Sequence, residues 1–251
     1  MATRNSRLFY LLMLGQLLLS PMLASGSDFL EFLKKMENSY ASINDYTALF
    51  RRQERVSGKL KPAETIFLKF QKPFKFYMRW LDGAHAGREA VYVEGLNDNK
   101  VFVHEPHGLA RFVTVQLEPD GDRVLKESRF PFTEIGIGRI IERMGEGVYK
   151  TKVGKPLTLA DRGRETIQGR EFRRLEGLAA PGSKESRPFH RIILVFDEQL
   201  SLPSQIVLYD WDNLMIGEYL YNDIRLNPGL QKTDFDTSNP NYNFPHWVIS
   251  H

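Results

Sequence analysis

The segment TIFLKFQKPFKFYMRW, residues 65–80, holds two short runs in which apolar and polar side chains alternate. A period of two places successive side chains on opposite faces of a β-strand. The dipeptide Lys72-Pro73 between the runs is typical of a turn. The segment therefore predicts an antiparallel hairpin with one apolar face. The side chains on that face are Ile66, Leu68, Phe70, Phe74, Phe76, Met78 and Trp80.

Similar runs continue along most of the chain and are separated by short turns. They cover residues 46–56, 90–93, 100–104, 111–117, 149–153, 157–160, 170–176, 190–196, 204–209 and 215–225. Short turns join neighbouring strands into antiparallel meanders, and strands do not alternate with helices, so a parallel sheet is not expected. The pattern predicts a mainly β protein with one continuous, strongly curved antiparallel sheet.

Two helices are expected beside this sheet. Asp28 and Glu31 have capping-box spacing at the start of the first. Its apolar face consists of Phe29, Phe32, Leu33, Met36 and Tyr40. Its polar face has no basic bias, so we expect it to cover the edge or mouth of the sheet rather than to lie on a membrane. A second, short helix is predicted over residues 133–144, with Gly145 at its end.

The N-terminal segment has the three-part pattern of a secretory signal peptide. Two arginines precede an apolar run over residues 8–19, and small residues follow it. We expect cleavage after Ala24 or Gly26, which assigns residues 1–26 to the signal peptide and residues 27–251 to a single β domain in the periplasm. An uncleaved membrane anchor is the alternative.

Composition excludes several classes of site and partner. The chain has no cysteine, which excludes disulfides, thiolate metal sites, a cysteine nucleophile and the acylated cysteine of a lipoprotein. Basic residues number 34 and acidic residues 31, and the two kinds are interspersed. A nucleic-acid partner is not expected, because it requires a clustered basic surface.

No catalytic or metal-binding motif is present in the sequence. The segment His104-Glu105-Pro106-His107 spaces its histidines three apart around a proline, whereas a zinc protease helix needs them four apart, so a turn is predicted. Asp-Gly-Asp at 120–122 predicts a hairpin turn, and the acidic pairs at 197–198 and 210–212 predict solvated strand ends. We expect no enzymatic activity, no metal and no cofactor.

The apolar strand faces leave two interpretations open. Ile192, Leu194 and Phe196 repeat, late in the chain, the pattern of residues 65–80. If the sheet closes tightly, such side chains fill its core, which is the default place for large apolar residues. If the sheet curves around a space, they line a cavity for an apolar ligand.

Motifs spread over the chain carry a family resemblance. They are Tyr40-x-x-Ile43-x-x-Tyr46-x-Ala48-x-Phe50, Lys72-Pro73, Arg79-Trp80, Leu202-Pro203-x-Gln205 and Tyr221-Asn222-Asp223-Ile224. Together they resemble the periplasmic lipoprotein carrier proteins of the Lol type. From about Phe29 to Phe244 the chain is also similar, more closely, to a bacterial family described only as a domain of unknown function within that superfamily. The resemblance implies an open, incomplete β-barrel with a helical lid and acyl chains inside.

This resemblance implies a periplasmic carrier or binding protein for lipids or acylated lipoproteins, with a membrane-bound donor or acceptor protein as a further partner. The apolar face of residues 65–80 is then the candidate wall, and Phe32, Leu33 and Met36 form the lid side. Lys72 is the candidate lid latch. The carriers have an arginine at this place, and lysine lacks its planar fork of donors. The alternative is a non-enzymatic envelope module, interaction or regulatory, that binds a protein partner through the same sheet.

Overall fold

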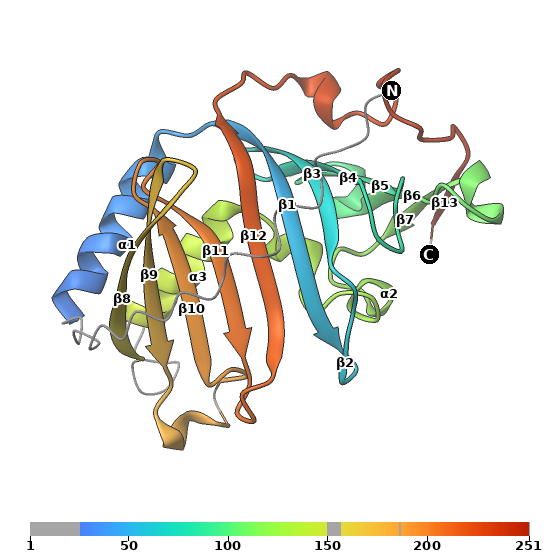
Figure 1. The fold of residues 1–251 in the computed structure, drawn as a ribbon. Coiled ribbons are helices and arrows are strands. Elements are labelled where there is room, and N and C mark those ends of the chain that lie inside the picture. The colour runs from blue at the N-terminus through green and yellow to red at the C-terminus, as the bar shows by residue number, and fades with distance from the viewer. Residues whose placement is uncertain (1–25, 150–156, 186, 251) are drawn as a thin grey trace, which may run out of the picture.

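One large, unclosed, curved sheet of thirteen strands dominates the computed structural model, which describes residues 26–149, 157–185 and 187–250 (Figure 1). Its order is β13-β7-β6-β5-β4-β3-β1-β12-β11-β10-β9-β8, and β2 pairs with β1. The strands are β1 (Asp45–Val56), β2 (Lys59–Leu60), β3 (Glu64–Gln71), β4 (Lys75–Trp80), β5 (Glu89–Val93), β6 (Val101–His104), β7 (Thr114–Leu117), β8 (Thr158–Ile167), β9 (Arg170–Leu178), β10 (Arg191–Asp197), β11 (Leu202–Tyr209), β12 (Met215–Leu226) and β13 (Val248–Ser250).

The predicted fold class, mainly β with one curved antiparallel sheet, is confirmed. Neighbouring strands pair antiparallel throughout the described order, except that the edge strand β13 runs parallel to β7. The two ends of the order, β13 and β8, remain edges, so the sheet is an incomplete barrel.

Helices cover the concave face of this sheet. The two long ones, α1 (Gly26–Ala41) and α3 (Ile137–Tyr149), pack against each other and against β11, and α3 lies behind the strands β10 to β12 in Figure 1. The other helical segments are α2 (Asp122–Leu125), η1 (Asn97–Asn99), η2 (Leu109–Phe112), η3 (Phe132–Glu134), η4 (Pro181–Ser183) and η5 (Lys232–Phe235). Leu33 and Met36 of α1 are fully buried, as an amphipathic covering helix requires.

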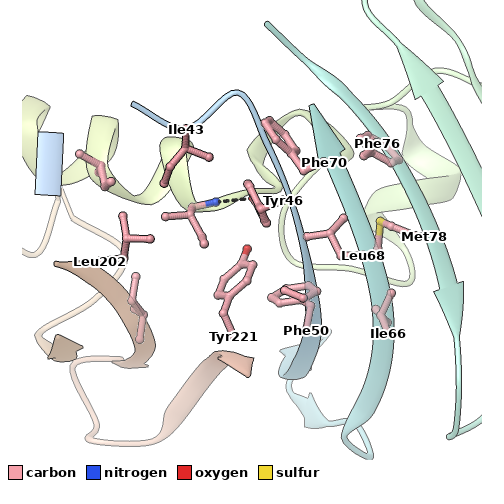
Figure 2. Close-up of a cluster of buried hydrophobic side chains, with 14 of the residues drawn as sticks. Ile43, Tyr46, Phe50, Ile66, Leu68, Phe70, Phe76, Met78, Leu202 and Tyr221 are labelled. Atoms are coloured by element: carbon pink, nitrogen blue, oxygen red, sulfur yellow. Dashed lines mark hydrogen bonds between the residues drawn. The ribbon is translucent and has the colours of Figure 1, made fainter. Parts of the chain in front are cut away.

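Strands β1, β3 and β4 pack their concave face against the start of α3. Ile66, Leu68, Phe70, Phe76 and Met78 share the buried face of β3 and β4 (Figure 2), and a Cβ atom at Gly136, just before α3, would stand 3.0 Å from the Phe70 ring. The hydroxyl of Tyr46 accepts a hydrogen bond from the backbone N–H of Ile137 at 3.0 Å, and that of Tyr221 accepts one from Gly136 at 3.3 Å. The first N–H groups of a helix have no partner inside the helix, so two buried tyrosines fix where α3 begins.

The C-terminal segment, residues 229–250, crosses the convex face of the sheet before β13 pairs with β7 (Figure 1). Lys69 Nζ donates to Asp234 Oδ1 at 2.6 Å. The ring of Tyr242 stacks on that of Tyr77, with centroids 3.9 Å apart. The tail therefore forms a second layer over the sheet, and it buries Tyr77, which alternation in residues 65–80 places on the face opposite the apolar one.

Two predictions about turns and strand ends are wrong. Residues 120–122 do not join two paired strands, because Asp122 begins α2, on the connection from β7 to α3. Asp197 is not solvated but 1% exposed. Its Oδ1 accepts hydrogen bonds from the backbone N–H groups of Gln199 and Leu200, each at 3.0 Å. The buried carboxylate thus holds the turn between β10 and β11.

The remaining predictions fall partly outside the described residues. The strand expected over residues 149–153 begins at Tyr149, which instead ends α3, and residues 150–153 are not described. The predicted signal peptide likewise lies outside, apart from Gly26. Among the described helices, none has the length and apolar character to span a bilayer.

Candidate functional site

A cavity of about 560 Å³ lies between the concave face of the sheet and the helices α1 and α3. Most of its lining is apolar. These side chains include Leu159, Leu175, Ile192, Leu194, Ile206 and Leu208 from β8 to β11, Ile140 and Met144 from α3, and Phe29 and Leu30 from α1. The cavity is thus bounded by an apolar sheet face on one side and by two helices on the other.

Strand register explains why this part of the sheet presents an apolar wall. Ile192 on β10 lies opposite Leu208 on β11, and Leu194 lies opposite Ile206, so alternation brings all four to the same face. Gly177 on β9 lies opposite Ile192. A Cβ atom at Gly177 would stand 2.8 Å from Ile192 Cγ2, so there is no room for a side chain here, and the glycine lets Ile192 pack directly against the β9 backbone.

One end of the cavity is polar and is organised by the buried carboxylate of Glu54. Its Oε1 accepts the hydroxyl of Tyr219 at 2.7 Å. Its Oε2 accepts Ser128 Oγ and the backbone N–H of Arg129, each at 3.0 Å. Burial and the charge of Glu54 raise the pKa of Tyr219, so this hydroxyl stays protonated and donates. The carboxylate therefore fixes the loop after α2 against β1 and β12.

A second carboxylate, Glu64, lies beside this end of the cavity. It accepts hydrogen bonds from Arg52 Nη2 at 3.2 Å and from Trp80 Nε1 at 3.3 Å, and it forms a further one with His85. Burial alone would raise the pKa of Glu64, but the hydrogen bond to His85 and the charge of Arg52 outweigh it and lower the pKa to about 2. Glu64 is therefore ionised at neutral pH and remains so well into the acidic range.

The predicted wall residues share the concave face, but most lie in its packed half. All seven are buried, with exposed fractions of 5% or less. Of these, Trp80 lines the large cavity, while Phe70 and Phe74 line a smaller pocket of about 350 Å³ beside Lys72. Ile66, Leu68, Phe76 and Met78 belong to the core. One half of the concave face is thus a packed core, and the other half lines a cavity.

The predicted lid residues are likewise buried in the core rather than in the cavity wall. Phe32 packs edge-on against Phe196, with ring centroids 5.4 Å apart, and Leu33 and Met36 are fully buried. The preceding turn of the same helix supplies Phe29 and Leu30 to the cavity. The helix expected to be a lid thus borders the cavity through a different turn, which the helical period alone did not show. Its action as a lid stays a prediction.

Lys72 occupies the position expected of a latch. Its Nζ donates to the backbone carbonyls of Tyr40 at 2.6 Å and Ala41 at 3.5 Å, the last residues of α1. The same ammonium lies 4.2 Å from the centroid of the Tyr40 ring. These contacts tie the turn between β3 and β4 to the end of α1. Control of a lid by Lys72 stays a prediction.

The lining of this site combines many apolar side chains with a few charged ones. Within the described residues, no group of three or more His, Cys, Asp or Glu side chains is placed to hold a metal ion. Burial lowers the pKa of His104, at the end of β6 in the segment predicted to be a turn. What the arrangement provides is an apolar space with a charged end.

Comparison with known proteins gives a family and several distant likenesses. No curated protein matches the chain. Among solved structures, a conserved protein from Thermus thermophilus has a TM-score of 0.49 at 11% identity, covering 89% of this chain and 99% of that one. Lipoprotein LppX from Mycobacterium tuberculosis has a TM-score of 0.48 at 12% identity, covering 84% and 100%. A LolA superfamily protein from Nitrosomonas europaea has a TM-score of 0.38 at 9% identity, covering 82% and 96%.

A family model matches most of the chain. The model of DUF1571, described as a protein of unknown function, matches residues 43–244. That range runs from the loop before β1 to the segment just before β13 and includes every strand that lines the cavity. The chain therefore belongs to the DUF1571 family.

Proposed function

We propose that this protein is a periplasmic carrier or binding protein that holds acyl chains, of lipids or of lipid-modified proteins, in the cavity between β8 to β12 and α3. The observation that carries the proposal is a cavity of about 560 Å³ with a mostly apolar lining. Pockets that enclose small organic ligands commonly measure about 300–1,000 Å³.

The energetics of burial suffice for such a ligand without any catalytic group or cofactor. Each methylene removed from water contributes about 0.8 kcal/mol. About ten buried methylenes therefore contribute about 8 kcal/mol, which corresponds to a dissociation constant near 1 μM before the entropy of association is subtracted. Ile192 and Leu208 on the sheet and Ile140 on α3 supply this environment from opposite sides.

A second candidate function, an envelope module that binds a protein partner, is favoured by one feature of the opposite edge. Leu109 is 88% exposed, Phe112 56% and Trp247 78%. Thr114 N–H donates to the Trp247 carbonyl at 2.6 Å, so these side chains gather around β7 and β13. Exposed apolar groups of this kind mark interaction sites. In a carrier the same edge would meet a donor or acceptor protein.

A cavity-filling variant tests the proposal against a matched control. Ile192→Trp places an indole in the cavity, whereas Ile193→Trp places it on the opposite, half-buried face of the same strand. A fluorescent acyl probe should bind the wild type and the Ile193→Trp variant, and Ile192→Trp should lose at least about tenfold in affinity. Equal binding by both variants, or none by the wild type, would contradict acyl binding in this cavity.

The natural ligand is identified by purification from the native host. The secreted protein, isolated without detergent, is extracted with organic solvent and analysed by mass spectrometry. Acyl species at about one per protein are expected. Repeatedly empty preparations that also fail to take up the probe would count against carriage.

A further inference from the structure

Two arginines at the polar end of the cavity have no acidic partner. Arg123 on α2 and Arg129 in the following loop both line this end. Within the described part of the chain, neither guanidinium forms an ion pair with a carboxylate. Arg52 and Arg88, at the same end, are instead paired with glutamates. No carboxylate among the described residues therefore neutralises Arg123 or Arg129, and both guanidinium groups can reach an anion at this end of the cavity.

The position of Arg129 is fixed by its backbone, so its side chain is not needed to hold the loop. The Arg129 N–H and the Ser128 hydroxyl both donate to Glu54 Oε2, at 3.0 Å each. Ser128 Oγ also accepts Arg52 Nη1 at 3.0 Å. These contacts hold the Arg129 backbone at the rim of the cavity, so the point from which its side chain extends toward a ligand is fixed.

A third arginine at this end has an unsatisfied donor. Arg88 is 8% exposed. Its Nη1 donates to Glu127 at 2.8 Å and its Nη2 pairs with Glu105 at 2.6 Å. Its Nε is buried and has no hydrogen-bond partner among the described residues. Buried donors without an acceptor are rare because they have lost their water without replacement, so this N–H indicates that an oxygen-bearing group belongs here.

We infer that the polar end of the cavity binds the anionic head group, a phosphate or a carboxylate, of an amphiphile whose acyl chain lies in the apolar part. This inference rests on the proposed function and specifies its ligand class. The planar guanidinium groups of Arg123 and Arg129 can each donate two hydrogen bonds to the oxygens of either anion. The cavity has a charged end and an apolar part, as an amphiphile has a charged head group and an apolar chain.

The test compares ligands that share one chain and differ in the head group. Binding of dodecyl phosphate, dodecanoate and dodecanol is measured calorimetrically. The wild type should bind at least one anion about tenfold more tightly than the alcohol, and the better anion identifies the head group. In Arg123→Gln/Arg129→Gln this preference should disappear while the alcohol binds as before. Lys126→Gln, an exposed change beside α2, should leave the preference unchanged.

The outcomes separate this inference from the proposed function. Equal affinity of the wild type for all three ligands overturns the head-group site and leaves acyl binding intact. Failure to bind any of the three overturns both. The wild-type comparison does not depend on a variant, so misfolding of the double variant cannot mask the result. Raising the salt concentration should reduce the preference for the anions, because exposed charges such as Arg123 are screened.

Discussion

Replacing Lys72 by methionine tests whether this residue holds α1 over the sheet. Three contacts are lost: the hydrogen bond to the Tyr40 carbonyl at 2.6 Å, the longer one to Ala41 at 3.5 Å, and the ammonium 4.2 Å from the Tyr40 ring. A cation at a helix C-terminus contributes about 0.3–1 kcal/mol, and an exposed cation–π contact about 0.5–1 kcal/mol. Because Lys72 is only partly buried, we expect Lys72→Met to cost about 1–2 kcal/mol in total.

Thermal unfolding and hydrogen exchange measure this cost. For a domain of this size, about 1–2 kcal/mol lowers Tm by about 2–8 °C, and backbone amides in the last turn of α1 should exchange faster. Lys72→Arg should match or exceed the wild type, because arginine can donate to both carbonyls in a fixed geometry. Lys59→Met, at an exposed position on β2, is the control. An unchanged Tm together with unchanged exchange in α1 would refute the latch.

Three further changes test the core, the helix packing and the tail. The pKa of Glu64 is about 2, below its ordinary 4.5, so the ionised carboxylate stabilises the fold at neutral pH, and this stabilisation is lost as the pH falls from about 5 toward 2. Glu64→Gln should therefore lower the free energy of unfolding in urea by about 2 kcal/mol at pH 7, and the difference from the wild type should shrink toward pH 3. Gly138→Ala places a Cβ atom 2.5 Å from Tyr40 Cε1. This overlap should lower the free energy of unfolding by about 1–3 kcal/mol, although alanine favours the helix more than glycine does. An increase in the free energy of unfolding would show that α1 and α3 are not in close contact. Tyr242→Ala removes the ring stacked on Tyr77 and should cost about 2 kcal/mol and expose the tail to proteolysis; unchanged resistance would contradict the packing of the tail.

The hairpin of residues 65–80 was predictable because the alternating pattern that determines it lies within the segment itself. Alternation fixes which side chains share a face, and the observed register pairs Leu68 with Met78 and Phe70 with Phe76, as the pattern requires. The mainly β class and the first covering helix follow from the same kind of periodicity. A period of two also gives the shared face of Ile192 and Leu194, which lines the cavity.

What the sequence did not reveal depends on contacts between distant segments. The start of α3 is held by hydrogen bonds to Tyr46 and Tyr221, which come from strands far apart in the chain. Tyr77 is buried only because the tail returns over the convex face. The sequence suggests that Asp197 is a surface acid, but in the structure the turn that follows β10 donates two backbone hydrogen bonds to its carboxylate. Alternation cannot show any of these three arrangements.

The dependence of affinity on chain length tests acyl binding in the cavity most directly. Straight-chain fatty acids of increasing length are titrated into the purified protein and the dissociation constants compared. If methylenes enter the space lined by Ile192 and Leu208, the dissociation constant should fall about fourfold for each one added, until the cavity is full and the trend levels off. Affinity that does not change with chain length, or no binding at any length, would contradict the account.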